Sequence, residues 1–361
     1  MGKITRRTRS GILNALVIFF TIGLVIYLGA TNGDIDDTWL ALRSADTGWM
    51  IAAAGSFLVF IVFESLGLHV FFRQQGIRAK FPSSLMVSLI GMFYSNVTPA
   101  ATGGQPMQVF AFKKRGIPTG VSSSGLAVKF FCFQMAVLSL GGLMWILHPG
   151  IVGQHIDRGR VIVVTGFVLN GITVLAVLLL TVNRNIVRAI IALLIRLGKA
   201  LHLIKSVESA SARADAALAD FGASVDMLTH HPIRLLGILG ISYIQVLGLM
   251  SMAYCVYRAM GQDTATYGEI LTLQALLYIA ASFTPLPGAS GAQEGGFYLF
   301  FQDIFPENKL LAALLLWRFF TYYLTLIIGL ICVSADSVMT IRRQKREGAP
   351  GPEEDRQEGI G

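Results

Sequence analysis

Four ionisable residues lie inside long apolar stretches of this sequence: Glu64, Lys129, Glu294 and Arg318. An ionisable group in an apolar environment is energetically expensive, and within a membrane it usually has a function. Two interpretations are open. Lys129 and Arg318 could meet an anion that crosses the membrane, or they could form buried ion pairs with Glu64 or Glu294 that only fix packing.

Two further stretches combine proline, glycine and glutamine in a way that suits phosphate binding. Glycine lets an anion approach the backbone, and a helix that starts after a break points free N–H groups towards it. The residues expected to contact a phosphate-bearing headgroup are Asn96, Thr98, Pro99, Gly103, Gly104, Gln105 and Pro106 in the first stretch, and Pro285, Pro287, Gly288, Ser290, Gly291, Gln293 and Glu294 in the second. The alternative is that the glycines only permit close helix packing.

The composition places these residues in a membrane protein. Of the 361 residues, 54% are hydrophobic and 14% are charged, whereas soluble proteins have about 25% charged residues. Six apolar runs are long enough to cross a bilayer; they are residues 11–30, 49–72, 121–147, 161–182, 232–258 and 309–334. The net charge of +8 fits attraction to anionic lipid at the cytoplasmic face, and no nucleic-acid partner is expected.

Lysine and arginine predict the orientation of the spans. With both termini in the cytoplasm, the cytoplasmic segments contain 21 basic residues, whereas the segments on the opposite side contain five. We therefore expect a multi-pass protein of the cell inner membrane with cytoplasmic N- and C-termini.

Two apolar stretches, residues 83–110 and 269–305, are interrupted by the proline- and glycine-containing segments. Each leaves two half-length helices around a helix-breaking centre. The basic loops on both sides of the first stretch predict that it enters and leaves from the cytoplasm, so the second must enter from the outer face. We therefore predict two re-entrant helical hairpins of opposite orientation.

An internal repeat supports this arrangement. Residues 99–106 align with residues 287–294 at an offset of 188, with four identities in eight positions. The same offset brings the spans on either side into register. The predicted fold is an all-α polytopic membrane protein with six full spans, two oppositely oriented re-entrant hairpins and an inverted repeat. The repeat units are about 49–147 and 232–334, within a membrane domain of residues 1–334.

The remaining segments have simpler interpretations. Residues 184–231 are expected to form a cytoplasmic amphipathic insert that packs on the protein's own surface, although a homo-oligomer or a separate lipid-modifying enzyme stays open as a partner. Residues 335–361 are expected to form a disordered cytoplasmic tail. Cys132, Cys255 and Cys332 are far apart and lack metal-ligand spacing, so no metal and no cofactor are expected.

These motifs resemble the flippase-like family, the lysylphosphatidylglycerol synthase transmembrane region. The resemblance covers about residues 10–335 and rests on Asn96, Pro99 and Gly103–Pro106, on the following Lys113–Gly116, and on Pro285–Glu294. It implies movement of an amphiphilic lipid across the bilayer, such as a modified phospholipid or a polyprenyl-linked precursor. The synthases also have a large soluble domain that aminoacylates lipid. Only about 27 residues follow the last predicted span here, too few for such a domain, so the synthase activity is not expected.

Two other functions are weaker. The sequence around Ser290 is similar to the serine motif of rhomboid intramembrane proteases, but that chemistry needs a histidine on a later span, and the last histidine is His231. A non-transporting scaffold for lipid or envelope biosynthesis would depend on the 184–231 insert rather than on Gln105 or Gln293. We therefore expect a lipid transporter and not an enzyme.

Overall fold

The computed structural model describes residues 35–156, 159–182 and 231–347, together with isolated positions between 186 and 226. All regular secondary structure in these residues is helical. The α-helices are α2 (Ile35–Arg43), α3 (Thr47–Gln74), α4 (Phe81–Val97), α5 (Gly104–Lys114), α6 (Thr119–Leu147), α7 (Pro149–His155), α8 (Arg160–Val182), α11 (Pro232–Ala259), α12 (Tyr267–Ala281), α13 (Ala292–Phe301), α14 (Glu307–Arg318) and α15 (Leu324–Glu347). Two 3-10 turns, η1 (Pro99–Ala101) and η3 (Pro287–Ala289), and a π-helical segment, η4 (Phe319–Tyr323), complete the set.

Five helical stretches are long and apolar enough to cross a bilayer. Four of them are α3, α6, α8 and α11, and the fifth is the continuous run of α14, η4 and α15. They agree closely with five of the predicted spans, so the protein is a multi-pass, all-helical membrane protein. The first predicted span, residues 11–30, lies outside the described residues.

Two pairs of shorter helices each surround a break. α4 and α5 are joined through η1, and α12 and α13 are joined through η3. Proline disfavours the α conformation in the residue before it. Accordingly Thr98, which precedes Pro99, and Leu286, which precedes Pro287, both have an extended backbone. The same local cause therefore interrupts both apolar stretches.

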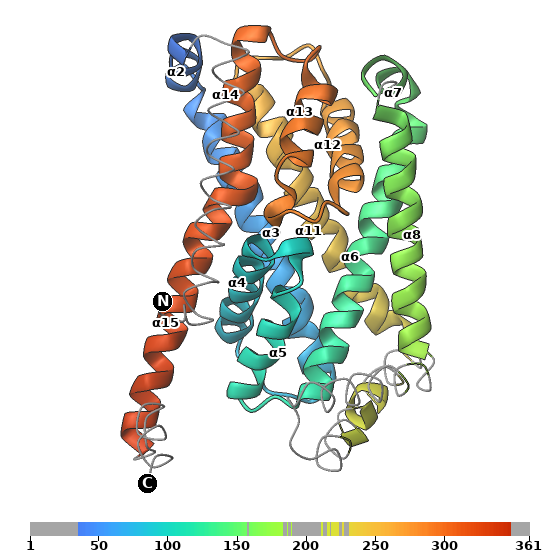
Figure 1. Ribbon diagram of the computed structural model, residues 1–361, viewed down its shortest axis with the longest axis vertical. Helices are drawn as coiled ribbons and strands as arrows, with labels where there is room; N and C mark the ends of the chain where they lie inside the picture. Colours follow the sequence, from blue (N-terminus) through green and yellow to red (C-terminus); the bar gives the residue numbers. More distant parts are fainter. Residues whose placement is uncertain are drawn as a thin grey trace, which may run out of the picture.

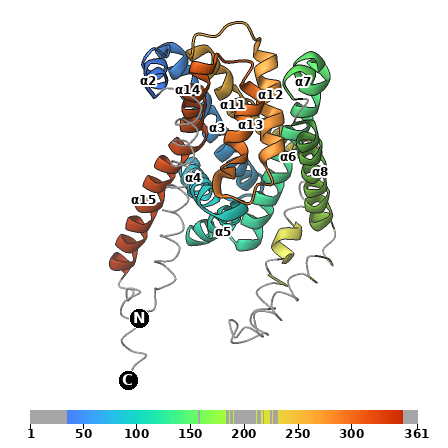
Figure 2. The same cartoon turned by 45° about the horizontal axis from the view of Figure 1, so that its top comes forward.

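The two broken pairs lie in opposite halves of the molecule. Figure 1 shows α4 and α5 in the lower half and α12 and α13 in the upper half, with the breaks facing each other between them. The tilted view in Figure 2 keeps this order. In Figure 1 the run of α14 and α15 lies on one side of the pairs and α6 and α8 lie on the other, and both breaks lie near mid-height.

The apolar core that positions the broken pairs consists of two clusters. A large cluster joins α11–α14 with parts of α3 and α6, and a smaller one around Phe72 and Phe112 joins α3, α5 and α6. α3 and α11 approach closely at Gly248, where a Cβ would lie 3.0 Å from the backbone nitrogen of Phe60. In contrast, α8 has a row of exposed apolar side chains, including Ile162 and Ile172, as expected for a face turned towards lipid.

The C-terminal region corrects one expectation. α15 continues to Glu347, so residues 335–347 are helical and do not belong to a disordered tail. This stretch contains neither proline nor glycine, and nothing in it stops the helix. Residues from 348 onwards, and most of the insert at 184–231, lie outside the described residues.

Candidate functional site

The two breaks contact each other directly. The backbone N–H of Ala100 in η1 donates a hydrogen bond to the carbonyl of Pro285, just before η3, at 3.0 Å. A second link comes from Tyr322, whose hydroxyl donates to the Asn96 carbonyl at 3.4 Å. Two segments almost 190 residues apart in sequence therefore form one site between the broken helix pairs.

The two breaks share a left-handed backbone at two successive matching positions and then diverge, because Gly103 has φ of −82° and the matching Gly291 has φ of 88°. Ala100 and Ala101 have φ of 50° and 54°, and Gly288 and Ala289 have φ of 62° and 51°. These positions are related by the offset of 188, and the helices that follow begin at Gly104 and Ala292, again 188 apart. Alanine rarely adopts the left-handed conformation, so three such alanines in two matched turns indicate a shared backbone design.

The first break is open and uncharged. Pro99, Gln105 and Pro106 are exposed, and Asn96 is half-buried. The Thr98 hydroxyl orders the turn, because it donates to the Tyr94 carbonyl at 2.6 Å and accepts the N–H of Gly103 at 2.9 Å.

Its two glycines differ in their surroundings. Gly104 is buried against the Ser95 side chain, which a Cβ would overlap, so close packing explains this glycine. A Cβ at Gly103 would crowd Thr98, the residue that orders the turn.

The second break contains a buried ion pair. Glu294, in the first turn of α13, is completely buried. One carboxylate oxygen, Oε2, accepts the N–H of Gly291 at 2.6 Å. The other, Oε1, accepts from Arg318 Nε at 2.6 Å and lies 2.5 Å from its Nη2. The same Nη2 also donates to the Gly288 carbonyl at 3.2 Å, so Arg318 binds both the carboxylate and the break.

The other expected residues of the second break are mostly buried. Ser290 is buried and its hydroxyl donates to the Pro287 carbonyl at 2.9 Å. Gln293 is 8% exposed, and its Oε1 has no hydrogen-bond partner among the described residues. Pro287 is buried, whereas Pro285 is exposed and Gly288 is half-buried. This break is therefore covered by side chains to a greater extent than the first.

Glu64 and Lys129 form a second buried ion pair, away from the breaks. Lys129 on α6 contacts Glu64 Oε1 on α3, and Gln245 Nε2 on α11 donates to Glu64 Oε2 at 2.6 Å. The group joins three spans. Each intramembrane cation expected from sequence is thus paired with a carboxylate, but only the Arg318 pair contacts a break.

Sequence reasoning missed Tyr322 and Asn170. Tyr322 lies in η4, its ring is 4.9 Å from the Arg318 guanidinium, and a Cβ at Gly288 would overlap it. Asn170 on α8 accepts from Gln134 and donates to Ser282 at the end of α12, both at 2.7 Å. A polar residue within an apolar span is a signal that could have identified Asn170. Nothing in the sequence predicts the π-helical segment, a feature that is frequent at functional sites.

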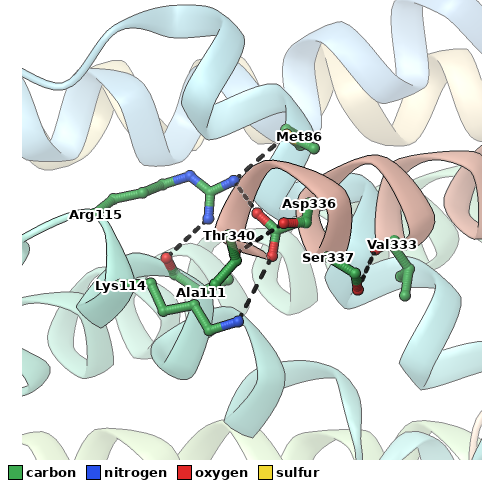
Figure 3. A network of polar contacts seen from close by, with 8 residues as sticks. All are labelled: Met86, Ala111, Lys114, Arg115, Val333, Asp336, Ser337 and Thr340. Atoms are coloured by element: carbon green, nitrogen blue, oxygen red, sulfur yellow. Dashed lines mark hydrogen bonds and ion pairs between the residues drawn. The ribbon is translucent and has the colours of Figure 1, made fainter. Parts of the chain in front are cut away.

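In the first broken pair, the charged residues lie at the end of α5 that is distant from the break. Figure 3 shows Arg115, just after α5, bound to Asp336 on α15 at 2.6 Å, with Lys114 4.0 Å from the same carboxylate. Arg115 also donates to the Ala111 carbonyl at 2.9 Å. This network fixes the lower end of α5 to α15 and leaves the break itself free of charge.

The sequence profile of the lysylphosphatidylglycerol synthase transmembrane region matches residues 12–329. The chain belongs to this family. Two similar proteins are each named "UPF0104 membrane protein": one from Archaeoglobus fulgidus is 23% identical over 82% of this chain and 89% of its own length, and one from Methanothermobacter thermautotrophicus is 24% identical over 81% and 85%. The matched residues include both breaks and both buried ion pairs. The match confirms the resemblance that the two motifs indicate.

Proposed function

We propose that this protein moves a phosphate-bearing lipid, such as a modified phospholipid or a polyprenyl-linked precursor, from one leaflet of the membrane to the other. The direct contact between the two breaks is the observation that carries the proposal. The family adds chemical context, because its name refers to the membrane region of an enzyme that makes a modified phospholipid.

The proposal treats α4–α5 and α12–α13 as re-entrant hairpins of an inverted repeat, within six spans whose termini are cytoplasmic in the cell inner membrane. Three observations support it: the broken pairs lie in opposite halves of the molecule, both turns place two successive matching residues at positive φ, and their second helices start 188 residues apart. α5 and α13 contain 11 and 10 residues, or about 16 and 15 Å at 1.5 Å per residue. End to end they match a hydrocarbon core about 30 Å thick.

Exposed backbone at this depth needs a polar environment. Residues 99–102 are exposed, as are Pro285 and Leu286, yet non-helical backbone is tolerated within the hydrocarbon region only where protein or water covers it. We infer a hydrated passage beside the breaks through which a headgroup moves while its apolar chains stay in lipid. Gln105 and the start of α5 offer donors to the phosphate.

The test is lipid movement in reconstituted vesicles. Protein is inserted into liposomes that contain fluorescently labelled phosphatidylglycerol or a labelled polyprenyl phosphate, and reduction of the label from outside reports the fraction that has crossed. We expect faster loss of the inner-leaflet label than in empty liposomes. Gln105→Leu should slow it several-fold, because a donor beside the start of α5 is lost.

Gln302→Ala is the matched control, because Gln302 is an exposed glutamine after α13, at the end of that helix distant from the break. It should transport like the unmodified protein. If no lipid moves faster than in empty liposomes, the transport proposal is wrong, and a scaffold that acts through residues 184–231 becomes the better explanation. If Gln105→Leu and Gln302→Ala move lipid at equal rates, the first break does not take part in transport.

A further inference from the structure

The Glu294 carboxylate occupies the second break in the way that a bound oxyanion would. One oxygen lies on a backbone N–H at the start of α13, and the other lies on the Arg318 guanidinium. A helix N-terminus together with an arginine is the donor set that binds phosphate in many proteins. Here that donor set already holds an anion, which is a side chain of the protein itself.

Among the residues that the structure describes, none supplies such an anion to the first break. The position that matches Glu294 at the offset of 188 is Pro106, and Phe130 matches Arg318. Within the part of the chain that the structure describes, the start of α5 therefore has neither a carboxylate nor an arginine at these matching positions. Its turn shares the two positive φ values at Ala100 and Ala101 but differs at Gly103, where φ is −82° rather than the 88° of Gly291. The matching N–H groups have different partners, since the Glu294 carboxylate accepts from Gly291 and the Thr98 hydroxyl accepts from Gly103.

We propose that Arg318 and the N-terminus of α13 form a phosphate-binding site in which Glu294 is an internal substitute for the phosphate of the lipid. When Glu294 takes up a proton from the aqueous phase, its carboxyl group releases Arg318, and a phosphodiester takes its place. This inference rests on the proposed function and adds to it the coupling of phosphate binding to one proton.

Charge balance explains why the exchange needs the proton. Glu294 is completely buried and Arg318 is 3% exposed. Adding a phosphate to the ionised pair would leave an extra buried negative charge, which is strongly unfavourable. Uptake of one proton with a singly charged phosphodiester leaves the buried charge unchanged. The two anions can therefore replace each other at the same cation.

Arg318 also has contacts that do not involve the carboxylate. Its Nη2 donates to the Gly288 carbonyl, and its guanidinium lies 4.9 Å from the Tyr322 ring and 5.7 Å from that of Trp317. The adjacent Gln293 has a buried acceptor oxygen with no partner in the described residues. A protonated carboxyl at Glu294 is a donor of the kind that this buried oxygen lacks.

The charged and titratable groups around Glu294 are few. Arg318 belongs to α14 and pairs with Glu294, the Tyr322 ring of η4 lies 4.9 Å from the Arg318 guanidinium, and Tyr323 packs on Tyr322. On α12, Glu269 accepts the N–H of Thr266 at the other end of the helix, and Tyr278 packs against Phe133. Within the described residues, Glu294 is the acidic group paired with Arg318, so it carries the predicted pH dependence.

The experiment measures binding to the full-length protein in nanodiscs. The probe is radiolabelled dihexanoyl phosphatidylglycerol, a phosphodiester whose charge is constant over the pH range used, and dimethyl phosphate is the headgroup analogue without chains. For the unmodified protein, Kd should rise with pH, and by no more than about tenfold per pH unit, as expected for one coupled proton. Glu294→Gln should bind tightly at every pH and lose this slope.

Two further variants address folding. Glu294→Gln/Arg318→Gln leaves no buried charge unpaired and should bind neither probe. Glu64→Gln removes a carboxylate from the other ion pair and should keep the pH slope. If Glu294→Gln retains the slope of the unmodified protein, the inference is wrong, whether or not labelled lipid moves in vesicles. Loss of lipid movement in the unmodified protein would instead contradict the proposed function. If the two probes bind with equal Kd, the exchange of Glu294 for a phosphodiester is supported, but the assignment of a lipid as the ligand is wrong.

Discussion

The two breaks share part of their backbone conformation but not their chemistry. Both turns follow a proline, both place two successive residues at positive φ, and both lead into a short helix. Pro99, Gln105 and Pro106 are exposed at the first, whereas Glu294 and Arg318 are buried at the second. The comparison teaches that two similar turns can have different side chains around them. Side chains of the first break are exposed, whereas the charge of the second is neutralised within the protein itself.

The largest effect is expected from removing the cation of the second break. Arg318→Ala leaves the Glu294 carboxylate buried without its partner, and breaking a buried pair in this way costs about 3–5 kcal/mol in free energy of unfolding. The loss should appear as a lower unfolding temperature in detergent at neutral pH. The first break has no equivalent charge, so Gln105→Ala should change stability by less than about 0.5 kcal/mol.

The double variant Glu294→Gln/Arg318→Gln is the control for this prediction. It removes both charges and should recover most of the stability lost in Arg318→Ala. If the double variant is as unstable as the single one, the ion pair is not the source of the effect, and the packing of Arg318 against Tyr322 is the more important contact.

A smaller effect is expected from exchanging the residues at the matching left-handed positions. Gly288→Ala places a Cβ at φ 62° that overlaps the Tyr322 ring, and strain with overpacking should cost about 2–4 kcal/mol. Ala100 has φ 50° and is exposed. In Ala100→Gly, relief of about 1–2 kcal/mol of strain is offset by about 0.5–1 kcal/mol from the greater flexibility of glycine.

Thermal unfolding of both variants checks this contrast. We expect a clear loss for Gly288→Ala and a free energy of unfolding within about 1 kcal/mol of the unmodified protein for Ala100→Gly. Equal losses at the two positions would mean that the turns tolerate side chains alike, and the contact between Gly288 and Tyr322 would then have little importance.

Much of the fold follows from patterns along the chain. Apolar runs predict five of the spans within a few residues, and Pro99 and Pro287 predict both breaks, because proline acts on its immediate neighbours. The offset of 188 predicts corresponding turns. The prediction of a disordered tail from residue 335 is wrong for Asp336 and the basic residues up to Glu347, because polar residues also form helices beyond a membrane surface.

The candidate site was less accessible to sequence reasoning. The four intramembrane charges were identified by their cost in an apolar environment, but the choice between phosphate contact and ion pairing depends on distances between helices. The link from Tyr322 to Asn96 and the contact between Ala100 and Pro285 join residues far apart in sequence. A single sequence contains no signal for such contacts when the partners are common, uncharged residues.

The smallest effect is expected where the first broken pair has its charges. Asp336→Asn removes the carboxylate that binds Arg115 at 2.6 Å and lies 4.0 Å from Lys114. Arg115 is half-buried, and pairs near the surface contribute about 0–1 kcal/mol, less at high salt. We expect faster hydrogen exchange near Arg115 with little change in unfolding temperature. If Asp336→Asn lowers the unfolding temperature as much as Arg318→Ala does, this prediction is wrong. The charges at the end of α5 would then stabilise the first broken pair as strongly as the ion pair at the break stabilises the second.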